Sequence, residues 1–66
     1  MVYQILEKDG KAVSDIPCED KLSAERWALK WARAEASADQ YLVKFGNAGA
    51  AHLFRTAGGQ WYVMND

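Results

Sequence analysis

The 66-residue sequence contains a single cysteine, Cys18, and a single histidine, His52. One cysteine cannot form a disulfide within the chain, and these two residues are too few ligands for a zinc site. The usual aids to stability in a small fold are therefore missing. The N-terminus lacks the basic segment followed by an apolar segment that is typical of a signal peptide. Together with a lone reduced cysteine, this predicts a cytoplasmic protein.

Long apolar runs and an excess of charge of either sign are also missing. No run approaches the ~20 apolar residues of a membrane span, so we expect no membrane partner. Eight Lys and Arg residues against nine Asp and Glu residues give a net charge of -1, which argues against non-specific affinity for nucleic acid. A chain that is 50% apolar and 26% charged is ordinary globular protein, and we predict a single domain over residues 1–66.

No catalytic arrangement is visible in the sequence. A general base needs a positioned partner, and no Ser/His/Asp or Cys/His pattern provides one for His52. Cys18 is followed by Glu19 and Asp20, whose carboxylates disfavour a thiolate. The glycine-containing turns lack the helix start that a phosphate-binding loop requires. We therefore predict no enzyme activity, no metal and no cofactor.

Aromatic residues, by contrast, are plentiful, with three Trp, three Tyr and two Phe. Two of the tryptophans lie in a helical pattern predicted over about residues 24–36. Ser23 is a good N-cap, and Leu22 and Trp27 have the spacing of a hydrophobic staple. One apolar arc of this helix would carry Ala24, Trp27, Ala28, Trp31, Ala32 and Ala34.

Alternating apolar residues between turn signals predict five strands, over residues 2–7, 11–16, 40–45, 50–56 and 60–64. Because the turns are short, neighbouring strands should be antiparallel. The expected order is two strands, the helix and three strands. This defines an α+β fold in which one helix lies across an antiparallel sheet.

Turn lengths give expected registers. A three-residue loop at 8–10 would oppose Glu7 with Lys11 and Ile5 with Val13, which avoids opposing two lysines. A four-residue turn at 46–49 would oppose Phe45 with Ala50, Val43 with His52 and Tyr41 with Phe54. A three-residue loop at 57–59 would oppose Arg55 with Trp61, Phe54 with Tyr62 and Leu53 with Val63.

These registers place apolar residues on both faces of the last three strands, although a single helix covers only one face. We expect the face with Tyr41, Val43, Phe45, Phe54 and Tyr62 to pack against Trp27 and Trp31. The other face, which the N-terminal hairpin or a chain end could also cover, is then the candidate partner-binding surface. It consists of Leu42, Lys44, Leu53, Arg55, Trp61 and Val63.

The sequence therefore favours a small non-enzymatic protein-binding module that uses its C-terminal sheet. Its partner would be another protein or a second copy of the chain, and regulation or inhibition of a larger protein would fit. The alternative is a nucleic-acid-binding module. Its residues would be the helix stripe Arg26, Lys30 and Arg33 together with Lys44, Arg55 and a base-stacking Trp61.

Overall fold

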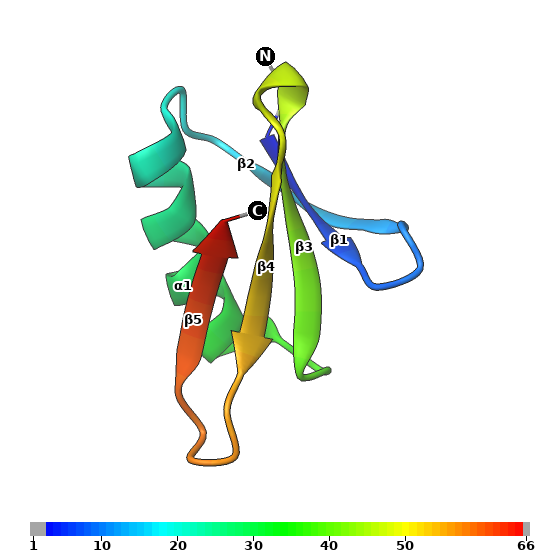
Figure 1. Ribbon diagram of the computed structural model, residues 1–66, viewed down its shortest axis with the longest axis vertical. Helices are drawn as coiled ribbons and strands as arrows, with labels where there is room; N and C mark the ends of the chain where they lie inside the picture. The colour runs from blue at the N-terminus through cyan, green and yellow to red at the C-terminus, as the bar shows by residue number, and fades with distance from the viewer. Residues whose placement is uncertain (1–2, 66) are drawn as a thin grey trace.

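The computed structural model describes residues 3–65, so Val2, predicted to belong to the first strand, lies outside the described residues. One helix packs against one sheet (Figure 1), as the sequence predicts. The elements in chain order are β1 (Tyr3–Glu7), β2 (Ala12–Ile16), α1 (Lys21–Glu35), β3 (Gln40–Phe45), the 3₁₀ turn η1 (Gly46–Ala48), β4 (Ala50–Arg55) and β5 (Trp61–Asn65).

The sheet has the strand order β2-β1-β3-β4-β5, and every neighbouring pair is antiparallel. Helix α1 carries the chain from β2, at one edge of the sheet, back to β3 beside β1. The α+β fold class and the ββαβββ order are therefore confirmed. In Figure 1 the helix lies on one side of the sheet, and the turn between β1 and β2 projects on the other side.

The first hairpin closes as expected and then departs from its predicted register. The Glu7 N–H donates to the Lys11 carbonyl at 2.7 Å, and Gly10 takes a φ of 99°, which a residue with a Cβ adopts only at a cost. A β-bulge then shifts the pairing, so that Ile5 lies opposite Ser14 rather than Val13. The predicted Ile5–Val13 pair is wrong because a bulge adds one residue to β2.

Helix α1 begins three residues earlier than the sequence predicts. Asp20 is the N-cap, and its Oδ2 accepts a hydrogen bond from the Ser23 N–H at 3.0 Å. The predicted cap at Ser23 is wrong because Asp20 caps the helix three residues earlier, and Ser23 is then the N3 residue whose N–H the cap accepts. The predicted staple fails with it, since Leu22 lies inside the first turn and is exposed.

The Asp20 cap makes the stability of the helix depend on pH. Hydrogen bonds from the Ser23 N–H and the Ser23 side chain lower the pKa of this carboxyl below 3.8. A lowered folded-state pKa stabilises the fold above the unfolded-state pKa, and this contribution disappears as the pH falls through the folded value.

We expect Asp20→Ala to lower the melting temperature at pH 7, and the difference from wild type to shrink below about pH 4. Thermal unfolding followed by circular dichroism at several pH values measures this difference. Asp20→Asn is the matched control, because it keeps a capping oxygen without the titrating charge and should show a smaller deficit. A deficit that is the same at pH 7 and pH 2 would contradict a charged cap.

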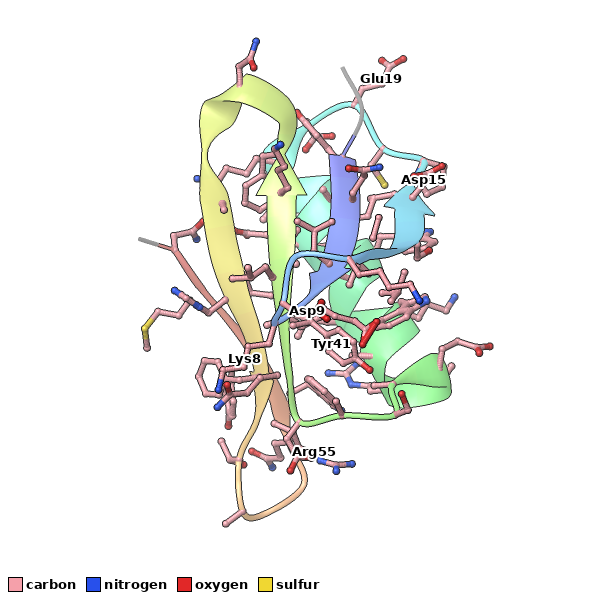
Figure 2. All side chains as sticks on the ribbon, turned by 90° about the vertical axis from the view of Figure 1, so that its right-hand side faces the viewer. Lys8, Asp9, Asp15, Glu19, Tyr41 and Arg55 are labelled. Carbon is pink, nitrogen blue, oxygen red and sulfur yellow. The ribbon has the colours of Figure 1, made fainter. Side chains whose placement is uncertain are left out.

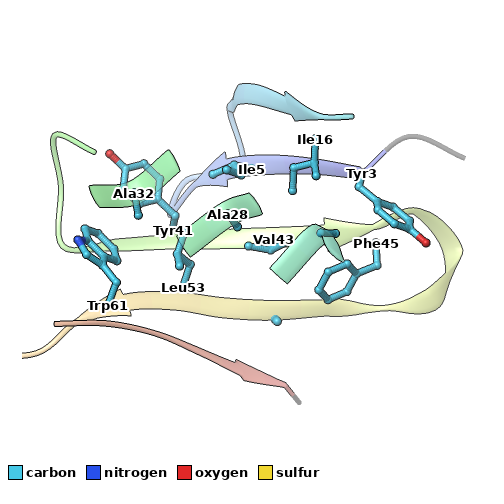
Figure 3. Close-up of a cluster of buried hydrophobic side chains, with 12 residues drawn as sticks. Tyr3, Ile5, Ile16, Ala28, Ala32, Tyr41, Val43, Phe45, Leu53 and Trp61 are labelled. Atoms are coloured by element: carbon cyan, nitrogen blue, oxygen red, sulfur yellow. The ribbon is translucent and has the colours of Figure 1, made fainter. Parts of the chain in front are cut away.

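The core lies between α1 and the helix-facing side of the sheet (Figure 3). Ala24, Ala28 and Ala32 repeat every fourth residue, so they form one row along the helix, and all three are buried. Their small side chains allow the helix to lie close to the strands. The larger buried side chains come from the sheet: Tyr3, Ile5, Ile16, Tyr41, Val43, Phe45, Leu53 and Trp61.

The register between β3 and β4 differs by one residue from the predicted one. The Phe45 N–H donates to the Gly49 carbonyl at 2.9 Å, so the turn closes at Phe45 and Gly49 rather than at Phe45 and Ala50. Tyr41 then lies opposite Leu53, and Val43 opposite Ala51. Because side chains alternate along a strand, a slip of one residue exchanges the two faces of β4.

The pairing of β4 with β5 is the predicted one, with Arg55 opposite Trp61 and Leu53 opposite Val63. Both strands therefore present to the helix the face that was predicted to point away from it. Leu53 and Trp61 belong to the core, and the prediction that Phe54 and Tyr62 lie there is wrong. Tyr41, Val43 and Phe45 are in the core as predicted.

Candidate functional site

The side of the sheet away from α1 is the candidate functional surface, and we call it the open face (Figure 2). In the part of the chain that the structure describes, no helix covers it. The strand registers place on it Gln4, Leu6, Gln40, Leu42, Lys44, Ala50, His52, Phe54, Tyr62 and Met64.

Apolar side chains occupy the middle of the open face, in two rows that run across the strands. One row joins Leu6, Leu42, His52 and Met64, and the next joins Phe54 to Tyr62. The Phe54 and Tyr62 rings contact each other, with their centroids 6.0 Å apart. Met64 is 59% exposed and Tyr62 is 47% exposed, values typical of surface residues rather than of the core. Neighbouring exposed apolar groups of this kind are characteristic of interaction surfaces.

The open face contains a hollow of about 430 Å³. The turn between β1 and β2 projects on this side of the sheet, so Lys8 forms one wall of the hollow (Figure 2). The strands β3, β4 and β5 form its floor. The residues around it are Lys8, Gln40, Tyr41, Leu42, His52, Leu53, Phe54 and Met64.

The surroundings of this hollow carry charges of both signs, since Glu7, Asp9 and Asp39 border the adjoining hollow that shares Lys8 with it. Lys8 lies at its wall, and no carboxylate is among the residues that line it. Lys44 is exposed on the same face. The nearest acid in the same row as Lys44 is Asp15, which accepts a hydrogen bond from Gln4 at 3.3 Å. The floor of the hollow is apolar, so an apolar group would match it.

Tyr41 has the most distinctive polar environment near the hollow. Burial of its phenol opposes ionisation, but donors from Ser37 and Ala38 outweigh that effect and lower the pKa of Tyr41 below 10.0. The phenol oxygen accepts the backbone N–H groups of Ser37 at 2.9 Å and Ala38 at 3.1 Å. These bonds tie the segment after α1 to β3. They satisfy backbone groups at the helix end, which is a structural role.

The six residues predicted to form the partner-binding surface do not share one face. Leu42 and Lys44 lie on the open face, and their role in binding stays a prediction. Leu53 is fully buried and Trp61 is 7% exposed, both on the helix side. Val63 is partly buried against the same core, and Arg55 lies over the Trp61 ring, with Cζ 5.7 Å from its centroid. The predicted exposure of Leu53 and Trp61 is wrong because the one-residue slip exchanges the two faces of β4 and β5.

Sequence reasoning missed four contributors to the open face: Phe54, Tyr62, Met64 and Lys8. Phe54 and Tyr62 were assigned to the core face by the same register error. The conformation of the turn explains the register, because Gly46 and Gly49 both take positive φ. Two such glycines allow a tight 3₁₀ turn that closes directly at Gly49.

The residues of the nucleic-acid alternative lie on different surfaces. Arg26, Lys30 and Arg33 are exposed on α1, on the helix side of the sheet, whereas Lys44 is on the open face. Trp61 is buried between Tyr41 and Arg55, so its rings are not available for base stacking. A single basic, aromatic surface is therefore not formed by these residues.

No candidate metal site is found in residues 3–65. Within that range, no three His, Cys, Asp or Glu side chains lie close enough together to hold a metal ion. Cys18 is a free, partly buried cysteine, and His52 is exposed on the open face. In the same range, no helical segment has the length and apolar character that crossing a membrane requires.

Comparison of the chain with protein-family models, with curated proteins and with solved structures finds no match.

Proposed function

We propose that this protein is a small non-enzymatic protein-binding module whose binding surface is the open face. The observation that carries the proposal is the pair of exposed apolar side chains on β5, at the edge of this face, where Met64 and Tyr62 are 59% and 47% exposed. Covering such side chains removes apolar area from water, which is the main driving force of most protein association. The hollow beside Met64 would accept an apolar side chain of the partner.

Regulation or inhibition of a larger protein is the role we propose for such a module. A surface of this kind acts by occupying a complementary surface and needs no reacting group. We place this activity in the cytoplasm, where the free Cys18 would remain reduced.

Two residues of almost equal exposure allow a matched test of the proposal. Met64 on the open face is 59% exposed, and Leu22 on α1 is 57% exposed. We expect Met64→Ser to reduce capture of the specific partner from a lysate of the source organism at least about tenfold, whereas Leu22→Ser leaves capture unchanged. Quantitative mass spectrometry of material bound to immobilised wild type and both variants measures the difference.

Both variants should remain folded, because surface substitutions change stability by only about 0.5 kcal/mol. Circular dichroism and thermal unfolding verify this before capture is compared. If Met64→Ser captures the same proteins as wild type in the same amounts, the open face is not the binding surface. If Leu22→Ser alone loses them, the helix side is the binding surface instead.

A further inference from the structure

The two edges of the sheet differ in how well they are protected against pairing with another strand. Edge strand β2 contains a β-bulge, carries the charged Asp15 and ends before Pro17, all features that discourage strand addition. Edge strand β5 has the sequence Trp-Tyr-Val-Met-Asn, with no charge and no proline. Its register with β4 has no bulge. Strand β5 is therefore the unprotected edge.

The hydrogen bonds of the hairpin show which backbone groups of β5 face outward. The Thr56 N–H donates to the Gln60 carbonyl at 2.9 Å, so these residues form a hydrogen-bonded pair. Hydrogen-bonded pairs alternate along an antiparallel ladder, which places Tyr62 and Met64 in such pairs with β4. The remaining residues of the strand, Trp61, Val63 and Asn65, then direct their N–H and C=O groups away from the sheet.

We propose that two copies of this chain associate through β5, forming a continuous antiparallel sheet around a two-fold axis at Val63. In this arrangement Val63 pairs with Val63 of the partner subunit, and Trp61 pairs with Asn65 of the partner subunit. This register pairs all five residues of the strand, whereas a shift in either direction leaves residues unpaired. Each outward-facing pair exchanges two hydrogen bonds, as narrow pairs of antiparallel strands do.

The same register brings the two exposed apolar side chains of β5 into contact across the two-fold axis. Tyr62 lies opposite Met64 of the partner subunit, and by symmetry Met64 lies opposite Tyr62 of the partner subunit. These residues are 47% and 59% exposed in the single chain. Cross-strand aromatic contacts stabilise sheets, and methionine sulfur packs favourably against aromatic rings.

The charges that flank β5 are complementary under this symmetry. Glu25 on α1 accepts a hydrogen bond from the Asn65 side chain at 2.8 Å, so a carboxylate marks one end of the strand. Arg33, two turns along the helix, borders the same hollow as Gln60, Trp61 and Tyr62, so a guanidinium marks the other end. The two-fold axis places Asn65 beside Trp61 of the partner subunit. Glu25, which bonds to Asn65, therefore lies at the same end of the paired strands as Arg33 of the partner subunit, and both lie on the helix side of the sheet. Two pairs of opposite charge therefore accompany the paired strands.

The association should be weak and reversible, because five paired residues form a small interface by the standards of stable dimers. We expect sedimentation equilibrium at about 150 mM salt to show monomer and dimer in exchange, with a Kd on the order of 100 µM. Samples from about 10 µM to about 1 mM cover this range. A wild-type chain that remains monomeric throughout overturns the proposal.

Proline substitutions at neighbouring positions test the strand pairing itself. Val63→Pro removes an N–H that points away from the sheet, so the chain should keep its circular dichroism spectrum and become monomeric at all concentrations. Met64→Pro is the matched control, because its N–H bonds to β4 and its loss should unfold the strand. Dimerisation of Val63→Pro equal to that of wild type overturns the proposal, and so does unfolding equal to that of Met64→Pro.

A charge exchange tests the symmetry without altering the backbone. Arg33→Glu places two carboxylates at each end of the paired strands and should weaken the dimer roughly tenfold. The double variant Arg33→Glu with Glu25→Arg restores opposite charges and should return the Kd to near the wild-type value. Equal weakening in the single and double variants overturns the two-fold arrangement, and recovery in the double variant supports it.

Discussion

Leu53→Ala should unfold most of this protein at room temperature or lower its melting temperature by tens of degrees. Leu53 is a residue of β4 that is fully buried on the helix side of the sheet. Replacing a buried leucine with alanine costs about 2–5 kcal/mol. A single core in a chain of this size contributes only about 3–5 kcal/mol of net stability. The loss is therefore comparable with the whole free energy of unfolding, and urea denaturation followed by circular dichroism measures it.

The adjacent residue provides the control for this experiment. Phe54 is larger than Leu53 but lies on the open face and is only partly buried. Phe54→Ala should therefore cost less, about 1 kcal/mol, mainly through the lost contact with Tyr62. If Phe54→Ala destabilises the protein more than Leu53→Ala does, the one-residue register between β3 and β4 described above is incorrect and the register predicted from the sequence is right.

Trp61→Ala should have an effect of similar size, about 3–5 kcal/mol. Trp61 closes one end of the core, where its ring lies 6.2 Å from that of Tyr41 and beneath the Arg55 guanidinium. Arg55 is also held by an ion pair with Asp39, so removal of the indole leaves this anchored cation over an empty space. We expect a melting temperature lower by at least about 12 °C, since 1 kcal/mol shifts the midpoint by about 4–8 °C in a domain this small.

Tyr62→Ala is the matched control for Trp61→Ala. It removes an aromatic side chain from the next position of the same strand, but from the opposite face, where 47% of the residue is already exposed. The expected cost is about 1 kcal/mol. Equal destabilisation by the two substitutions would contradict the assignment of Trp61 to the core and would reopen its prediction as a binding residue.

The local elements of the fold were readable from the sequence because each has a short-range cause. Alternating apolar residues between glycine turns predict β3 over 40–45, and the structure has β3 at Gln40–Phe45. The loop before Gln60 predicts the register of β4 with β5, and that register is confirmed. The start of α1 was misplaced because Asp20 and Ser23 are both good caps, and only the observed bond from the Ser23 N–H to the Asp20 carboxylate distinguishes them.

The candidate site was not readable because both faces of β4 and β5 are apolar. A binary pattern specifies register when one face is polar, but here Leu53 and Phe54 are equally good core residues by hydrophobicity. The segment Gly46–Gly49 permits turns that close at either Gly49 or Ala50. A difference of one residue in that turn exchanged the predicted binding surface with the core.

The sequence by itself determined the helix, the five strands, their antiparallel connections and the presence of apolar side chains on both sides of the sheet. These properties depend on periodicity and turn chemistry within a few residues of one another. Only the tertiary structure decided the pairing of β1 with β3 and which side of β4 and β5 is covered. Both depend on contacts between distant residues, above all the close packing of the Ala24, Ala28 and Ala32 row against the sheet, which selects the face to be buried.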